Sequence, residues 1–308
     1  MLAPALIALD WGTTNLRAYL VGAGGEAIAR EERPLGIMQV AKADFAGALD
    51  ETLKSWLPLP PGIPLLACGM IGSRQGWREA PYVACPAGAA DVARGMTAVD
   101  WRDGHRVLLI PGISCRDGRG VPDVIRGEET QIFGAVAGDG GLFLLPGTHS
   151  KWVAVEKGRI VGFATFMTGE VFGVLRQHSI LGRTMQGEGI DEGGFRRGVA
   201  AAAEGGGALL HGLFGVRALS LFAEVTEREG AGYLSGLLIG TELWEAPRVL
   251  GLSGKVPAIR LIGQAHLCRS YAMAAAALGY ATSEAAPDAA LHGIWRLACA
   301  RGLAKETA

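Results

Sequence analysis

The sequence lacks the features that mark membrane, secreted and nucleic-acid-binding proteins. Its closest approach to a long apolar run is the Ala-rich stretch 272–278, which is far too short to span a bilayer. The N-terminal apolar run stops at Asp10 with no basic stretch before it, so we expect no secretory signal. The net charge of −1 offers no basic field for nucleic acid or anionic lipid. We therefore expect a cytoplasmic protein with neither nucleic acid nor a membrane as a partner.

Several common site motifs are also missing. The five cysteines are scattered and form no C-x-x-C pair, which argues against a zinc site and against a disulfide framework. The six histidines form no H-E-x-x-H pair. Gly254-Lys255 is followed by Val256 and lacks the earlier glycine of a P-loop, and the glycines of 138–141 precede a strand instead of following one. Zinc, P-loop and dinucleotide-binding functions are therefore not indicated.

What is present predicts an α/β protein. Hydrophobic residues make up 49% of the 308 residues, enough for a sizeable core, and the length suggests two domains. Segments with the strand period alternate with segments of the helical period. Strands are expected at 26–30, 63–68, 106–110, 160–166 and 259–262, besides strand–turn–strand hairpins at 6–21 and 142–155. Helices are expected at 44–57, after a loop within 123–138, from about 169, over 192–229 with a break at 205–207, and at 231–245, 265–278 and 288–303.

The hairpin at 6–21 carries the first indication of chemistry. Four apolar residues run into Asp10, and the turn that follows consists of Gly12 and the polar residues 13–15. Gly12 has no Cβ to block access, and backbone N–H groups and Thr hydroxyls in such a turn can converge on an anion. Asp10, at the end of the strand, could hold a metal ion or its waters. The same pattern is also typical of an ordinary hairpin with a polar turn, so this stretch alone leaves both interpretations open.

A second copy of the pattern favours the phosphate interpretation. Residues 142–163 repeat the order of residues 6–28: a strand, a glycine–hydroxyl turn, a strand, a glycine turn and a strand. The turn 147–150 (GTHS) stands opposite the turn 12–15 (GTTN), at an offset of 147 − 12 = 135 residues. A period this long is not that of a solenoid. It predicts a duplicated domain with two hairpins that bind phosphate.

The chain resembles the superfamily of actin, hexokinase and the heat-shock ATPases, whose duplicated ribonuclease-H-like domains each carry such a hairpin. Its stretch 259–279 fits the strand–Gly–helix element that holds adenosine in that superfamily. The more specific resemblance is to the 2-dehydro-3-deoxygalactonokinase family of bacterial sugar-acid kinases. It rests on the stretches DWGTTNLRAYL (10–20), CGMIGSRQGWREAPYV (68–83), PDVIRGEETQIFGA (122–135), LLPGTHSKWV (144–153) and FGVLRQHSILG (172–182).

The resemblance implies an α/β fold of two ribonuclease-H-like, actin-like ATPase domains around an interdomain cleft. The expected domains are 1–127, on the sugar-acid side, and 128–308, on the nucleotide side, with the last helix packing back on the first domain. The implied reaction is the phosphorylation of 2-dehydro-3-deoxy-D-galactonate by ATP, with Mg²⁺, to the 6-phosphate in galactonate catabolism. A kinase for another sugar or sugar acid, and a non-catalytic protein switched by ATP, stay open as alternatives, as does a homodimer.

The resemblance also assigns expected roles to residues. Asp10 is expected to hold Mg²⁺, and the residues expected to bind the nucleotide are Asp10, Gly12, Thr13, Thr14, Asn15, Arg17, Gly147, Thr148, His149, Ser150, Lys151, Gly263 and Gln264. Glu128 is the expected catalytic base because it opens the helix before the second hairpin, and Asp123 is its rival. The residues expected to bind the sugar acid are Gly69, Met70, Ile71, Gly72, Ser73, Arg74, Trp77, Arg126 and Arg176, since a guanidinium suits a carboxylate.

Overall fold

The computed structural model describes residues 4–187, 189–206, 208–252 and 254–305. The chain divides into two compact units. Unit 1 comprises the chain up to Gly140, the segment Val155–Gly162 and the chain from Ala285 onward, whereas unit 2 comprises Gly141–Ala154 and Phe163–Glu284. The expected boundary after residue 127 lies within unit 1, and the last helix, α9 (Ala289–Ala300), also belongs to unit 1.

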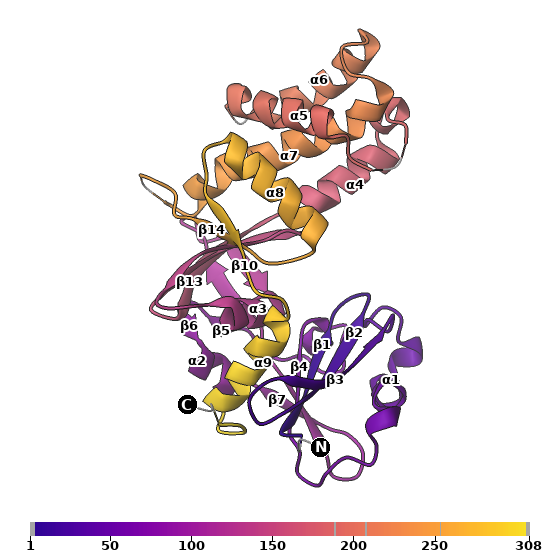
Figure 1. Cartoon of the computed structure of the whole chain (residues 1–308), viewed down its shortest axis with the longest axis vertical. Helices are drawn as coiled ribbons and strands as arrows, with labels where there is room; N and C mark the ends of the chain where they lie inside the picture. The colour runs from indigo at the N-terminus through magenta and orange to yellow at the C-terminus, as the bar shows by residue number, and fades with distance from the viewer. Residues whose placement is uncertain (1–3, 188, 207, 253, 306–308) are drawn as a thin grey trace. The chain divides into compact units, whose positions relative to one another are not determined.

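Unit 1 is built on a six-stranded sheet in the order β3-β2-β1-β4-β8-β7 (Figure 1). Its strands are β1 (Leu6–Trp11), β2 (Leu16–Val21), β3 (Ala27–Arg33), β4 (Leu65–Cys68), β7 (Thr97–Asp100) and β8 (Arg106–Leu109). β1, β2 and β3 are antiparallel neighbours, and β4 and β8 continue the sheet parallel to β1. Leu6 to Leu9 are fully buried, as expected for a strand with neighbours on both sides and a covered face. The predicted hairpin over 6–21 is confirmed.

The helices of unit 1 are α1 (Phe45–Thr52), α2 (Ala89–Arg94), α3 (Glu128–Ala135) and α9. Asp44 caps α1 by accepting a hydrogen bond from the Gly47 N–H at 2.9 Å, but the helix is shorter than predicted because the turn η2 (Lys54–Trp56) follows it. The prediction of a loop that begins at residue 123 is wrong for residues 123–125. There the chain forms β10 (Pro122–Ile125), which pairs with β9 (Ile113–Arg116) and, through it, β5 (Val83–Ala84).

Two glycines let α3 and α9 cross at backbone contact. A Cβ atom at Gly293 of α9 would lie 1.8 Å from the Thr130 carbonyl oxygen, and one at Gly134 of α3 would lie 1.9 Å from the Ala289 carbonyl oxygen. Real Cβ atoms do not approach so closely, so neither position tolerates a side chain without separating the helices. α9 therefore supports the helix that carries Glu128.

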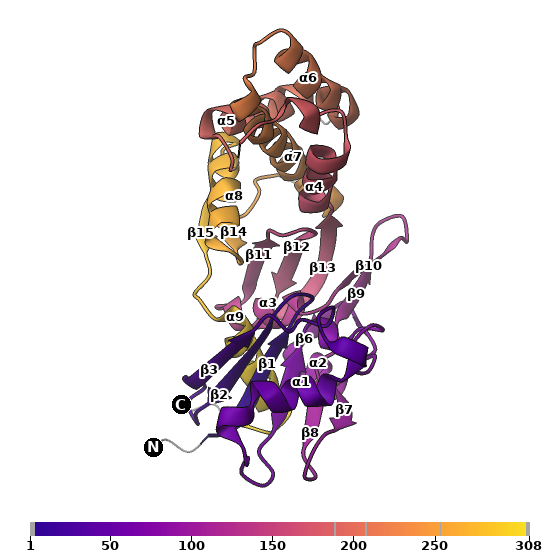
Figure 2. The same cartoon turned by 90° about the vertical axis from the view of Figure 1, so that its right-hand side faces the viewer.

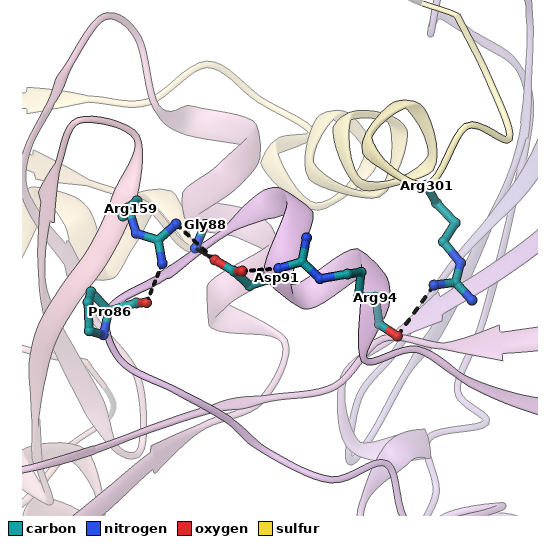
Figure 3. Close-up of polar contacts among 6 residues, drawn as sticks. All are labelled: Pro86, Gly88, Asp91, Arg94, Arg159 and Arg301. Carbon is teal, nitrogen blue, oxygen red and sulfur yellow. Dashed lines mark hydrogen bonds and ion pairs between the residues drawn. The ribbon is translucent and has the colours of Figure 1, made fainter.

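A charged cluster centred on Asp91 ties three segments of unit 1 together (Figure 3). Asp91 accepts a hydrogen bond from the Gly88 N–H at 3.0 Å, which lowers the pKa of its carboxyl group, and it pairs with Arg94 on its own helix. Arg159 contacts Asp91 at 2.9 Å from the start of β13, and Arg301, after α9, donates to the Arg94 carbonyl oxygen at 3.3 Å. These contacts hold the segment Val155–Gly162 and the end of the chain against α2.

The strands of the second sheet, most of which lie in unit 2, repeat the order seen in unit 1. They are β11 (Gly140–Leu145), β12 (Ser150–Glu156), β13 (Arg159–Phe166), β14 (Ile259–Leu261) and β15 (Thr282–Glu284). Their order is β15-β14-β11-β12-β13, with β14 parallel to β11 and β15 parallel to β14; beyond β13 the sheet continues to β6 (Ala87–Gly88). In both sheets three consecutive strands are followed by two strands added beside the first (Figure 2). This shared order confirms the predicted duplication and the α/β fold class.

The helices of unit 2 are α4 (Thr168–His178), α5 (Glu192–Gly205), α6 (Leu209–Leu221), α7 (Glu227–Val249) and α8 (Ala265–Ala277) (Figure 1). The stretch 192–229 is thus two helices and the start of a third. Gly206, with φ +56°, ends the first helix within the predicted break at 205–207. Gly207 of that break lies outside the described residues. α5 packs on α7 through glycines such as Gly198 and Gly236, where a Cβ atom would lie within 2.1 Å of a carbonyl oxygen of the other helix. In the described parts of the chain, no helix is both long and apolar enough to cross a membrane.

Candidate active site

The turn after β1 presents a row of backbone N–H groups. The carbonyl oxygens of residues 12–14 accept hydrogen bonds of 2.9–3.3 Å from the N–H groups of residues 36–38. The C=O and N–H of a trans peptide point in opposite directions, so the N–H groups of residues 13–15 point away from that segment. A Cβ atom at Gly36 would lie 2.2 Å from the Thr13 carbonyl, which explains why a glycine stands there. Successive N–H groups aimed to one side form a concave anion-binding site.

Asp10 ends β1 beside this turn. Its Oδ2 lies 3.6 Å from Nη1 of Arg17, which also contacts Glu32 at 3.1 Å. Its side chain is only 17% exposed, and burial raises the pKa of the carboxyl group while the Arg17 charge opposes that rise. Among the described residues there is no group of three or more His, Cys, Asp or Glu side chains that could hold a metal. A Mg²⁺ ion at Asp10 fits this environment if waters and phosphate oxygens supply its other ligands, as is usual for this ion.

The loop after β4 reaches the end of β1 through glycines. Residues 69–73 contain the turn η3 (Met70–Gly72), and Gly69, with φ +90°, would place a Cβ atom 2.7 Å from the Trp11 carbonyl oxygen. Gly127, with φ +101°, would place one 3.1 Å from the Cα atom of Gly69. The loop 69–73 and the residue before α3 thus contact each other at the carboxyl end of β1. The sequence motifs at 10–20, 68–83 and 122–135 meet here.

Two glutamates open α3 in different environments. Glu128 is half-buried, and its Oε2 accepts a hydrogen bond from the Arg126 N–H at 2.8 Å. Glu129 is fully buried and accepts hydrogen bonds from the Gly127 N–H at 2.7 Å and the Thr130 hydroxyl at 2.8 Å. Burial raises the pKa of Glu129 to about 7, and the negative charge of Glu128 adds to the rise. Glu128 is therefore the carboxylate that a substrate can reach, and Glu129 supports the start of the helix.

Cys68 lies beside Asp10 and within the electrostatic influence of Glu129. Its Sγ lies 3.8 Å from Oδ1 of Asp10 as a weak hydrogen-bond donor. Burial raises the pKa of the Cys68 thiol well above its ordinary value, and the charges of Asp10 and Glu129 raise it further. The thiol is therefore neutral and lies within electrostatic reach of both carboxylates. Asp123, the rival base, stands on β10, where its Oδ1 accepts a hydrogen bond from the Val124 N–H at 2.7 Å.

Arg126 is the buried cation of this region. It is 9% exposed, donates from Nη2 to the Ala80 carbonyl oxygen at 2.8 Å, and lies 4.3 Å from the ring centroid of Tyr82. Its Nε and Nη1 atoms are buried and have no hydrogen-bond partner among the described residues. Leaving a buried charged donor unpaired is costly, and such a group in a native protein requires an explanation. An anionic ligand within reach of these two nitrogen atoms would supply the missing partner.

Two other residues expected to bind the sugar acid have partners in unit 1. Arg74 is 86% exposed and contacts Glu79 at 3.0 Å. Trp77 is partly buried and packs against the core, with its ring centroid 6.5 Å from that of Trp11 and 6.4 Å from that of Phe45. In unit 2, Arg176 of α4 donates to the Gly187 carbonyl oxygen at 2.8 Å.

The second turn of the repeat rests on the start of α4. The Glu170 N–H donates to the Thr148 carbonyl oxygen at 2.9 Å, and the Glu170 carboxylate pairs with Nε2 of His149. A Cβ atom at Gly169 would lie 2.4 Å from the Gly147 carbonyl oxygen, so glycine is required at this contact too. The first residues of an α-helix expose N–H groups with a partial positive charge, so this turn also suits an anion.

The other unit 2 residues expected to bind the nucleotide are buried behind this turn or belong to neighbouring elements. Ser150 is fully buried, and Lys151, 6% exposed, donates from Nζ to the His149 carbonyl oxygen at 3.2 Å. Gly263, with φ +154°, would place a Cβ atom 3.5 Å from the Pro146 carbonyl oxygen, so it adjoins the turn. Gln264 is the exposed residue before α8.

The sequence analysis missed the residues that support the two turns from elsewhere in the chain. They are Gly36, Gly169, Glu170 and, described below, Glu242 and Tyr271. None of them belongs to a hairpin motif. The glycines have a weak signal, since each stands shortly after the third strand of its repeat, but nothing local marks the contact that each makes.

Comparisons with known proteins point to one family. The pattern of the 2-keto-3-deoxy-galactonokinase family matches residues 10–297. A protein of Rhizobium meliloti named as a probable 2-dehydro-3-deoxygalactonokinase is 38% identical over 86% of this chain and 86% of its own length. The 2-dehydro-3-deoxygalactonokinase of Escherichia coli is 33% identical over 93% of this chain and 94% of its own. A crystal structure from Sinorhizobium meliloti, assigned to the same enzyme, superposes with a TM-score of 0.87 at 35% identity and covers 96% of this chain and 98% of that one.

Proposed function

The chain belongs to the 2-keto-3-deoxy-galactonokinase family, and on this premise we propose that it transfers the terminal phosphoryl group of ATP to the 6-hydroxyl of 2-dehydro-3-deoxy-D-galactonate. The observation that carries the proposal is the meeting of Asp10, the loop 69–73 and the start of α3 at one end of the unit 1 sheet. Phosphoryl transfer requires mainly positioning and charge neutralisation, together with a group that accepts the hydroxyl proton. Each requirement has a candidate in the described residues.

The two turns supply phosphate donors. In unit 1 the N–H groups of residues 13–15 all point to one side, and in unit 2 the turn 147–150 adjoins the first turn of α4. Gly12 and Gly147 leave open the space that a Cβ atom would fill, since the nearest atoms to that position are 3.7 and 3.9 Å away. Asp10 would hold Mg²⁺ through its waters. The ion would neutralise phosphate charge during transfer.

Glu128 is the proposed base. It stands in the first turn of α3, where a carboxylate is electrostatically favoured, and it is accessible, whereas Glu129 is not. Its carboxylate would accept the proton of the 6-hydroxyl as the oxygen attacks the γ-phosphorus and the bond from that phosphorus to ADP breaks. The proton then ends on Glu128, the phosphoryl group on the sugar acid, and ADP leaves. Asp123 stays the alternative base. The unpartnered donors of Arg126 support it as the group that binds the substrate carboxylate.

The test is a panel of acceptors. The purified chain is given ATP and Mg²⁺, and ADP release is followed by a coupled assay with 2-dehydro-3-deoxygalactonate, its gluconate epimer, galactonate, glucose or no acceptor. We expect 2-dehydro-3-deoxygalactonate to give the highest kcat/KM. Equal rates with glucose would overturn the specific assignment. ATP binding without stimulation by any acceptor would favour a nucleotide-switched protein.

A pair of variants identifies the base in the same assay. Glu128→Gln is expected to lower kcat by about 10²- to 10⁴-fold, the usual contribution of a general base, while ATP still binds. Asp123→Asn is the matched control, because it makes the same change at the rival position. A large loss in Asp123→Asn with Glu128→Gln near the parent rate would reverse the two roles.

A further inference from the structure

We propose that Glu242 of α7 is a positioning residue for the hairpin β11–β12, holding the turn 147–150 in its nucleotide-binding form. This rests on the proposed function for the identity of the ligand. The Glu242 side chain lies in unit 2 and is 2% exposed. Its Oε1 accepts a hydrogen bond from Nε1 of Trp152 at 2.8 Å, and its Oε2 accepts one from the Tyr271 hydroxyl at 2.6 Å. Ser150 joins the group, with its Oγ 2.8 Å from the Tyr271 hydroxyl oxygen.

The proton arrangement follows from the inventory of donors. Tyr271 has one hydroxyl proton and gives it to Glu242, so the contact between Tyr271 and Ser150 requires Ser150 to be the donor. The Ser150 proton therefore points into the unit 2 interior, where a phosphate cannot use it. Ser150 then serves as an anchor of the hairpin, and the phosphate contacts fall to the other polar groups of the turn.

The hydrogen bonds around Glu242 also determine the direction of the Lys151 side chain. Side chains alternate across a strand, so Ser150 and Trp152 share one face of β12 and Lys151 lies on the other. Glu242 holds both residues of the first face, one directly and one through Tyr271. This arrangement directs Lys151 to the opposite face, where its Nζ contacts the His149 carbonyl oxygen at 3.2 Å.

A carboxylate is unusual at this place for stability alone. Burying a charge is expensive, and apolar side chains of similar volume often pack as well or better. Burial raises the pKa of Glu242, and hydrogen bonds that include those from Thr168, Tyr271 and Trp152 oppose the rise. Trp152 lies on β12, directly after the turn, and Thr168 opens α4, which contacts the turn. The donors of this buried acid are thus distributed around the hairpin.

The test compares Glu242→Gln with Thr241→Val. Thr241 precedes Glu242 on α7 and is 4% exposed, and its hydroxyl donates within its own helix, to the Leu237 carbonyl oxygen at 2.8 Å. It is therefore a matched control for a lost buried polar contact. Nucleotide affinity is measured by calorimetric titration of ADP and ATP without a sugar acid. We expect Glu242→Gln to weaken it at least tenfold and Thr241→Val less than twofold, with the KM for the sugar acid unchanged within twofold in both.

A purely structural role would lower Tm and leave nucleotide affinity alone. Folded Glu242→Gln with parental affinity would overturn the inference. If that variant does not fold, Tyr271→Phe takes its place, because it removes one hydroxyl and the link to Ser150; we expect at least a threefold loss, and parental affinity would again overturn the inference. A parent that binds nucleotide but phosphorylates no acceptor would refute the proposed function and leave this inference standing.

Discussion

Removing the carboxyl group of Glu129 should change how the stability of the protein depends on pH. In the folded protein burial raises the pKa of Glu129 from 4.5 to about 7, whereas in the unfolded chain the group ionises at its ordinary value. At 1.36 kcal/mol for each pKa unit, the difference corresponds to roughly 3 kcal/mol. Glu129→Gln keeps the shape of the side chain and removes the titration.

The sign follows from proton linkage. Between the two pKa values the folded state binds more protons at Glu129 than the unfolded state, so this residue makes the parent less stable as the pH rises. Its favourable contribution is complete below pH 4.5 and lost above pH 7. From pH 5.5 to pH 8 the parent should lose about 2 kcal/mol relative to Glu129→Gln. The amide also changes one hydrogen bond to Gly127 or Thr130, but that change is independent of pH and does not affect the slope.

The measurement is urea unfolding of the parent and Glu129→Gln, followed by tryptophan fluorescence at several pH values from 5.5 to 8. A ¹³C-carboxyl titration of the parent gives the pKa of Glu129 directly. Glu128→Gln is the control, since loss of the neighbouring charge should lower the pKa of Glu129 and flatten the parent curve. Parallel stability curves for the parent and Glu129→Gln, or a carboxyl titration near 4.5, would refute the reasoning about this buried carboxyl group.

Three further substitutions test other parts of the site. Asp10→Asn should raise the Mg²⁺ concentration needed for half-maximal activity by about 10- to 100-fold, because the carboxylate that orients the waters of the ion is lost; an unchanged Mg²⁺ titration would contradict its role. Arg126→Lys should raise the KM for the sugar acid about tenfold or more and leave the KM for ATP within twofold, since lysine lacks the planar fork; equal changes in both constants would argue for a structural role. Gly293→Ala should lower the free energy of unfolding by about 1–3 kcal/mol, because the Thr130 carbonyl oxygen, 1.8 Å from the new Cβ, is backbone and cannot yield. Gly215→Ala on α6, where nothing lies within 4 Å of a Cβ atom, is its control in calorimetry and should be stabilised by up to about 1 kcal/mol.

Much of the fold could be predicted because patterns of contiguous residues specify it. An apolar run followed by a glycine and polar residues specifies a strand and a turn wherever it occurs, so both hairpins were predictable. The repeat of that pattern implied two similar units, and the shared strand order bears this out. The prediction of a loop at residues 123–125 was wrong for a local reason. β10 has only four residues, too few for a period to be recognised, and its partner β9 is also short.

The sequence by itself thus determined the α/β class, the duplication, the two turns and the family pattern, since these depend on neighbours in the chain. Tertiary structure decided which residues meet. Gly69 and Gly127 come together because the parallel strand β4 lies beside β1 and α3 packs on α9, and no local pattern encodes that approach. The same holds for the burial of Glu129, which distinguishes it from Glu128, and for Glu242, which reaches β12 from a helix about 90 residues later. Burial and charge environment are properties of the assembled core. The roles of these carboxylates could therefore be assigned only from the tertiary structure.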